Sequence, residues 1–210
     1  MAEIVAEHAP ELKRLGFRKR RYGFNRTAGD GLVHVVKFWM APKEPPAWTE
    51  VPGLRERLYG HFCVEFGIYV PQMNRSGGPR GSWINEYNCQ LRRGIADPET
   101  RPWWSLDDPR SSAAAGSALW TIGLPWFDAL PDATAVLDAF GSPDGPPLGM
   151  SPAAALDIAD LCRARGETER ERRLLEAYVV EPVSRPHAPY LAAYLTERGH
   201  ADLVPSIRTR

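Results

Sequence analysis

Six polar residues in the middle of the chain have a spacing that would place them together on one face of a β-sheet. Residues 61–70, HFCVEFGIYV, alternate between apolar and more polar side chains, and residues 82–95 repeat this alternation. Successive side chains of a strand point to opposite faces, so two such neighbouring strands build one apolar face and one polar face. The polar face is predicted to carry Glu65, Tyr69, Glu86, Asn88, Gln90 and Arg92.

An acidic residue beside an arginine can hold a ligand or a side chain of a partner protein. Glu65, Glu86 and Arg92 are therefore the residues that a small-ligand binder or an enzyme would use on this face. The alternative is a cross-strand salt bridge on a solvated sheet face, which is the commoner outcome and contributes little free energy. The sequence leaves both interpretations open.

Other chemistries lack the residue patterns that they require. The glycine runs GDG and SGGPRG stand in no phosphate-loop context, and a G-x-S-x-G nucleophile motif is absent. The five histidines form no HxH or HExxH pattern, and the cysteines form no CxxC pair. We therefore predict no catalytic residue, no metal ligand and no cofactor, and we expect Cys63 and Cys89 to be small buried side chains.

The densest positive charge runs from Lys13 to Arg26, with aromatic side chains interleaved. Nucleic acid could use this mixture, because cations contact phosphates and aromatic rings stack on bases. Solvated cations on an edge strand, which prevent sheets from pairing edge to edge, are the commoner reason for such a run. Nucleic acid is therefore not the expected partner.

The surrounding pattern predicts an α+β fold: an antiparallel β-sheet covered by helices on one face, with a C-terminal all-helical extension. A helix is expected over residues 3–15, and the sheet over residues 17–95, with its central strand at 32–40. From Trp126 to Phe140 apolar positions recur every three or four residues, with Pro131 as a candidate helix start and Gly141 as its stop, and this helix should cover the apolar face of the sheet. The Pro- and Gly-rich segment 142–150 is the boundary between a domain at 1–141 and a small helical array at 151–210.

Three helices are predicted within that array, over residues 151–165, 167–179 and 186–199. An offset of 33 residues aligns the first with the third, including Gly166 with Gly199. This similarity indicates either a helix-pair repeat or two capped helices of similar amphipathicity, and two copies would not form a solenoid by themselves.

The composition is that of a folded chain without a dominant charge. Of 210 residues, 43% are hydrophobic, and 26 basic residues balance 26 acidic ones, so no global field favours nucleic acid or anionic lipid. Three widely spaced cysteines are typical of reduced thiols rather than of a disulfide framework. Residues 1–17 lack the apolar core of a signal peptide, and no stretch has the length of a membrane span. We expect a cytoplasmic protein that does not contact the membrane.

Five segments carry a family resemblance when they are taken in order: LKRLGFRKRRYGFNR, VHVVKFWM, FCVEFGIYVP, NEYNCQLRRGI and the WW pair at 103–104. Together they resemble the bacterial domain-of-unknown-function family 4304, over about residues 3–140. The family pattern has polar residues where this chain has Phe38 and Trp39. The resemblance implies no catalytic residues, and small bacterial domains of this kind are often immunity or accessory proteins that bind another protein.

These observations favour a non-enzymatic bacterial protein-binding domain, of an immunity or accessory type, whose partner is another protein. The alternative is a small-ligand binder or an enzyme that uses Glu65, Glu86 and Arg92. A flat polar face without a perturbed carboxylate would argue against the alternative.

Overall fold

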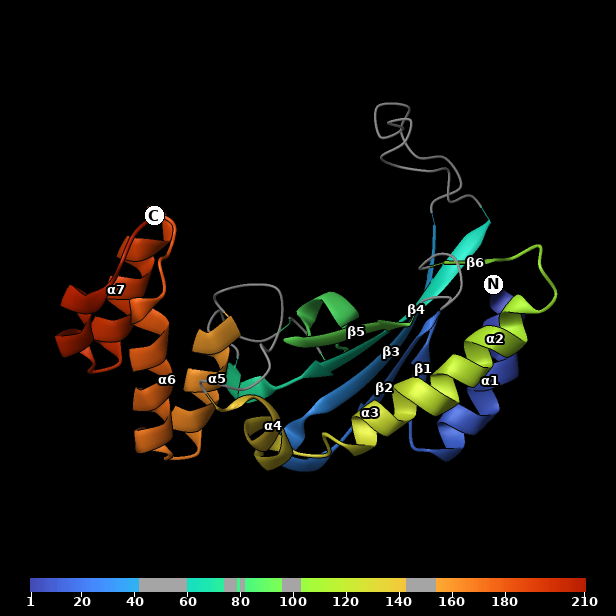
Figure 1. Cartoon of the computed structure of the whole chain (residues 1–210). Helices are drawn as coiled ribbons and strands as arrows, with labels where there is room; N and C mark the ends of the chain where they lie inside the picture. Colours follow the sequence, from blue (N-terminus) through green and yellow to red (C-terminus); the bar gives the residue numbers. More distant parts are fainter. Residues whose placement is uncertain (42–59, 74–78, 80–81, 96–102, 143–153) are drawn as a thin grey trace. The chain divides into compact units, whose positions relative to one another are not determined.

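The computed structural model describes residues 1–41, 60–73, 79, 82–95, 103–142 and 154–210 (Figure 1). The chain divides into two compact units. The first comprises Met1–Val70 and Pro79–Asp132, and the second comprises Pro71–Gly78 and Ala133–Arg210. The predicted α+β class with an antiparallel sheet is confirmed. The predicted boundary segment 142–150 lies, apart from Ser142, outside the described residues.

An antiparallel sheet forms the centre of the first unit (Figure 1). Its strands follow one another in the order β1-β2-β3-β4-β5, and β6 pairs with the start of β4 beyond the end of β5. The two longest strands, β3 and β4, pair along their whole length in the middle of the sheet, as predicted for the strand at 32–40. The strands are β1 (Arg18–Arg20), β2 (Gly23–Thr27), β3 (Val33–Met40), β4 (His61–Tyr69), β5 (Leu91–Ile95) and β6 (Trp104–Ser105).

Helices cover the apolar face of this sheet, and the even-numbered side chains of β4 point toward them. Phe127 is the main contact, because its ring lies 4.5 Å from the ring of His34 and 5.5 Å from that of Phe66. Gly123 lies against Phe66 so closely that a Cβ there would be 2.1 Å from the ring. The covering elements are α1 (Ala2–Arg14), α2 (Ser111–Ala118), the π-helical segment η5 (Leu119–Gly123) and α3 (Leu124–Asp128).

The helix expected to start at Pro131 and stop at Gly141 is present as α4 (Ala133–Phe140), and residues 129–132 interrupt the helical backbone before it. Helix α3 ends at Asp128, and α4 belongs to the second unit. Pro131 explains the interruption, because proline disfavours helical backbone in the residue before it and has no N–H to continue the helix. Its carbonyl instead accepts a hydrogen bond from the backbone N–H of Gly29, at 3.0 Å. Within the first unit, this part of the chain covers the sheet through α3.

Residues 82–90 form a turn rather than the first half of a strand. The 3₁₀ helix η4 (Glu86–Asn88) occupies its centre, and only Leu91–Ile95 pairs with β4. Asn85 and Asn88 cap this short helix reciprocally, each side chain binding the backbone of the other residue. Asparagine side chains offer the backbone such local partners, and these compete with the ladder of a strand.

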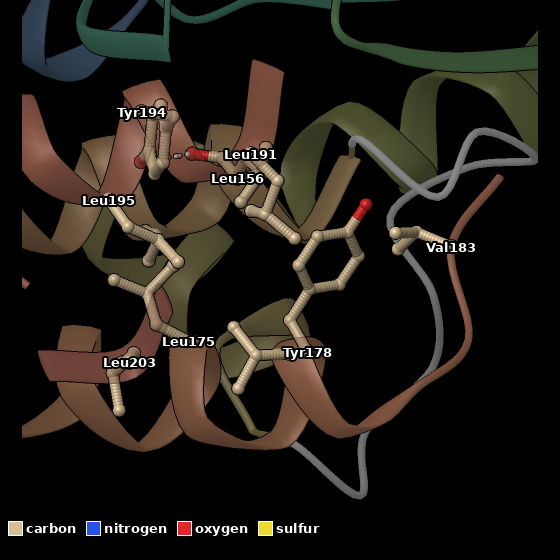
Figure 2. Packing of buried hydrophobic residues seen from close by; sticks show 10 residues of the cluster. Leu156, Leu175, Tyr178, Val183, Leu191, Tyr194, Leu195 and Leu203 are labelled. Atoms are coloured by element: carbon tan, nitrogen blue, oxygen red, sulfur yellow. Dashed lines mark hydrogen bonds between the residues drawn. The ribbon is translucent and has the colours of Figure 1, made fainter. Parts of the chain in front are cut away.

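The second unit is helical. Its core is a cluster of buried side chains from α5, α6, α7, η6 and the segment between α6 and α7, shown in Figure 2: Leu156, Leu175, Tyr178, Val183, Leu191, Tyr194, Leu195 and Leu203. Tyr194 also donates a hydrogen bond of 2.9 Å from its hydroxyl to the buried carboxylate of Asp160. The elements are α4, α5 (Ala154–Ala164), α6 (Thr168–Val180), α7 (His187–Glu197) and the 3₁₀ segments η3 (Pro71–Met73) and η6 (Ala201–Ser206).

The 33-residue offset is kept at the ends of two helices. Helices α5 and α7 end 33 residues apart, and each is followed by a glycine with positive φ, +74° at Gly166 and +79° at Gly199. The segments that follow, α6 and η6, also begin 33 residues apart, but η6 is short and contains Pro205. The two copies thus share the glycine that ends the first helix and the position at which the next segment begins. They differ in that segment, which is a full α-helix in α6 and a short 3₁₀ segment in η6. No helix in the described ranges is long and apolar enough to cross a membrane.

Candidate functional site

The turn formed by residues 83–90 lies on the second face of the sheet, opposite the helices. Gly67 in the middle of β4 makes this possible, because a Cβ there would stand 2.5 Å from the sulfur of Cys89 and 2.8 Å from its Cβ. At the other end of the turn, Trp83 packs over Gly23 of β2. Two glycines on this face therefore provide the space in which the turn sits.

Glu86 is the polar centre of the turn, although its side chain is only 4% exposed. Its Oε1 accepts a hydrogen bond of 3.0 Å from the indole Nε1 of Trp39 on β3. The Nε of Arg92 on β5 donates to the backbone carbonyl of Glu86, also at 3.0 Å. The turn is thus fixed to two strands of the sheet that are not neighbours in sequence.

Three other predicted site residues are also held in place by hydrogen bonds or packing within the protein. The Asn88 side chain accepts from the backbone N–H of Asn85 at 3.1 Å, and the Gln90 side chain accepts from that of Val70 at 2.9 Å. Tyr69 is buried in a small cluster under the turn: Val35, Tyr69, Ile84 and Cys89. The structure thus brings the six predicted residues to one face, where several serve to hold the turn.

Glu65 differs from the other five, because it is half-buried and its pKa is raised. Burial is the largest cause of this raised pKa, the nearby charge of Glu86 adds to it, and the charge of Arg92 opposes it. In the sheet Glu65 pairs with Lys37 of β3 on one side and with Gly94 of β5 on the other. A perturbed carboxylate is therefore present on the polar face.

Two large side chains on this face remain exposed to solvent. Trp39 is 41% exposed although its N–H is bonded, and Tyr87 is 64% exposed. Trp83 is half-buried, and the guanidinium of Arg20 lies 6.0 Å from the centre of its ring, within the range of a cation–π contact. We call this group the aromatic–arginine surface, and it consists of Arg20, Trp39, Trp83, Tyr87 and Arg92.

Four members of the aromatic–arginine surface were not among the predicted site residues: Arg20, Trp39, Trp83 and Tyr87. The alternation in residues 82–95 would place Tyr87 on the apolar face of a strand, whereas it lies in the 3₁₀ turn and is exposed to solvent. Trp39 shares the polar face with Lys37, two residues before it in the same strand. A bulky aromatic side chain on the same face as Lys37 was the available signal.

Two arginines of the basic run contact neighbouring side chains of the protein. Arg14 is paired with Glu11, and Arg26 lies over the ring of Phe17 at 4.8 Å and binds His34. The three residues of β1 are all exposed. They lie on an edge strand of the sheet, where cations discourage pairing with another strand. The nucleic-acid interpretation of this run stays a prediction.

The cysteines are buried and free. Burial raises the pKa of Cys63 and that of Cys89 to about 12, and that of Cys162 to about 11. Thiols of this kind are poor nucleophiles at neutral pH. Within the part of the chain that the structure describes, no three His, Cys, Asp or Glu side chains are grouped to hold a metal ion.

The chain matches no protein-family model, no curated protein and no solved structure. The resemblance to domain-of-unknown-function family 4304 stays a prediction.

Proposed function

We propose that this chain is a non-enzymatic protein-binding domain, of an immunity or accessory type, and that it binds its partner through the aromatic–arginine surface. The observation that carries the proposal is Trp39, an exposed indole held in one orientation by the buried carboxylate of Glu86. Tryptophan, tyrosine and arginine are the residues that contribute most binding energy in protein interfaces. All three occur together on this face.

The surface is organised before any partner binds. The indole of Trp39 is fixed by a hydrogen bond of 3.0 Å, and the amide of Asn85 donates to the hydroxyl of Tyr87 at 2.9 Å. Side chains that are already ordered lose less conformational entropy on association. Such a surface can therefore contribute more net binding energy than an equal area of mobile side chains.

The charge of the surface favours an acidic partner. Arg20 and Arg92 are exposed, whereas the carboxylate of Glu86 is buried and bonded. Opposite charge on a partner speeds association and selects against basic proteins. The proposed partner is thus a protein with carboxylates around an apolar contact, and the proposed location is the cytoplasm, where the three thiols would stay reduced.

Photo-crosslinking in cells tests the choice of surface. A benzoylphenylalanine residue at position 87 is expected to give a discrete crosslinked product with an acidic protein. The matched control places the same residue at Ala129, which is exposed at the end of α3 on the helical side of the unit. A product at both positions, or at position 129 alone, would reject the aromatic–arginine surface.

The raised pKa of Glu65 favours a second candidate function, the small-ligand binder or enzyme. A half-buried carboxyl group with a raised pKa, close to the charge of Arg92, could hold a polar ligand. Ligand screening by NMR tests this candidate, with a Glu65→Gln variant as the control. Compounds that shift the signals of residues 64–67 in the parent protein, and not in the variant, would favour the second candidate over the first.

A further inference from the structure

A cavity of about 560 Å³ lies between the N-terminal helix and the helical layer that follows β6. Glu7, His8 and Glu11 of α1 form one wall, and Gly116, Ser117 and Trp120 line the opposite wall. All of these residues belong to the first unit, on its helical side. The volume is within the range of small-ligand sites in proteins.

His8 is the unusual residue of this cavity. Its side chain is only 7% exposed, and its Nε2 has no hydrogen-bond partner among the described residues. The ring stacks on Phe38, with 6.1 Å between the centroids, and lies against Gly116, where a Cβ would stand 2.5 Å from its Cε1. A buried polar atom without a partner costs free energy, so such atoms are rare and often belong to sites.

The other wall groups have the chemistry of a cation site. Glu7 and Glu11 are carboxylates on one side of α1, four residues apart and hence on neighbouring turns. Glu7 accepts a hydrogen bond of 2.6 Å from the Ser112 hydroxyl, and Glu11 is paired with Arg14. The indole of Trp120 can attract a cation through the face of its ring.

The backbone at Trp120 is also irregular. The five residues of η5 form a π-helical turn between two α-helices, and Trp120 is its second residue. Single π turns inside α-helices are uncommon and frequently occur at functional sites. Here the irregular turn carries the aromatic side chain that lines the cavity.

We propose that this cavity binds a small organic cation through its ammonium or guanidinium group. Glu7 and Glu11 supply negative charge, Trp120 supplies an aromatic face, and the imidazole of His8 accepts a hydrogen bond from the cation. The occupant is either a free amine or a lysine or arginine side chain of another protein. This site is separate from the aromatic–arginine surface, and neither proposal depends on the other.

NMR titration of the full chain with n-butylammonium chloride tests the proposal, with n-butanol as the neutral isostere. The ammonium is expected to cause saturable shifts in residues 7–11 and 113–120, and the alcohol is expected to cause none. Glu7→Gln should weaken binding about tenfold, because one of the two carboxylates loses its charge. Glu3→Gln on the same helix is the matched control, since Glu3 is exposed and does not line the cavity.

His8→Phe keeps an aromatic ring on Phe38 but removes the acceptor, so it should weaken binding severalfold. If that variant does not fold, Glu7→Gln and Trp120→Leu still decide the matter. A blocked lysine tripeptide, compared with n-butylammonium, distinguishes a protein side chain from a free amine by which of the two binds more tightly. Equal shifts with n-butanol, shifts that do not saturate, or an equal loss in Glu3→Gln would overturn the proposal.

Discussion

Replacing Gly67 by alanine tests directly whether the turn of residues 83–90 packs against β4. Gly67 lies in the interior of β4, and its backbone does not have a positive φ. Alanine in place of glycine at such a position would by itself stabilise the fold by about 0.5–1 kcal/mol, because the unfolded chain loses freedom. Because the turn packs against Gly67, the variant should instead be less stable, since the new Cβ would stand 2.5 Å from the sulfur of Cys89.

The size of the effect follows from the atoms that must move. Cys89 is buried, and its Cβ, at 2.8 Å, cannot move without the backbone of the turn. Overpacking of one methyl group in a packed site costs about 1–3 kcal/mol. After subtraction of the glycine effect, we expect Gly67→Ala to lower the free energy of unfolding by about 1–2 kcal/mol.

Denaturation in urea followed by tryptophan fluorescence measures this change in the first unit, because every tryptophan of the sequence lies between positions 39 and 126. Gly94→Ala is the control, since nothing lies within 4 Å of a Cβ at that position in the neighbouring strand. In a Cys89→Gly background the cost of Gly67→Ala should disappear. A Gly67→Ala protein as stable as Gly94→Ala would refute the seating of the turn.

Three further predictions concern buried titratable groups. Burial lowers the pKa of His34 to about 4, so its neutral form stabilises the first unit above pH 6.5. This contribution, about 3 kcal/mol, should be lost as the pH falls from 6.5 to 4, because the unfolded chain binds a proton that folded His34 does not. In the His34→Phe variant the free energy of unfolding should therefore depend less on pH between 6.5 and 4. Burial, together with the nearby charge of Asp160, raises the pKa of Tyr194. The second unit should therefore lose stability above about pH 10, because the tyrosine of the unfolded chain ionises there. In a circular-dichroism titration the Tyr194→Phe variant should not show this loss of stability. The raised pKa values of the three buried cysteines predict that iodoacetamide at pH 8 labels the folded protein slowly and labels three thiols after unfolding. Rapid labelling of the folded protein would contradict the burial of the thiols.

The sequence was most informative where one periodicity dominates. The alternation in residues 61–70 correctly separated the faces of β4, because Phe62, Phe66 and Ile68 are fully buried on the helical side. The apolar run at 32–40 correctly indicated a central strand. Helix ends at Gly16 and Gly166 were also predictable, because both glycines adopt positive φ after a helix.

Local side-chain bonds and long-range packing were the parts that periodicity could not predict. Residues 83–90 alternate as a strand would, but the reciprocal bonds of Asn85 and Asn88 and the space above Gly67 fold them into a turn. The same turn exposes Tyr87 and brings Glu86 to Trp39, residues 47 positions apart in sequence. Pairings over such distances are set by the tertiary fold rather than by local pattern.

The central claim is that the aromatic–arginine surface binds a partner protein, and the affinity of Tyr87→Ala for the crosslinked partner tests it most directly. Tyr87 is mostly exposed, so its loss should leave the fold intact. The account predicts a loss of about 2 kcal/mol, or roughly 30-fold in Kd, as for a central interface tyrosine. Tyr190→Ala, which removes an exposed tyrosine from the second unit, should change Kd by less than about twofold. A Tyr87→Ala protein that binds as tightly as the Tyr190→Ala control would contradict the claim.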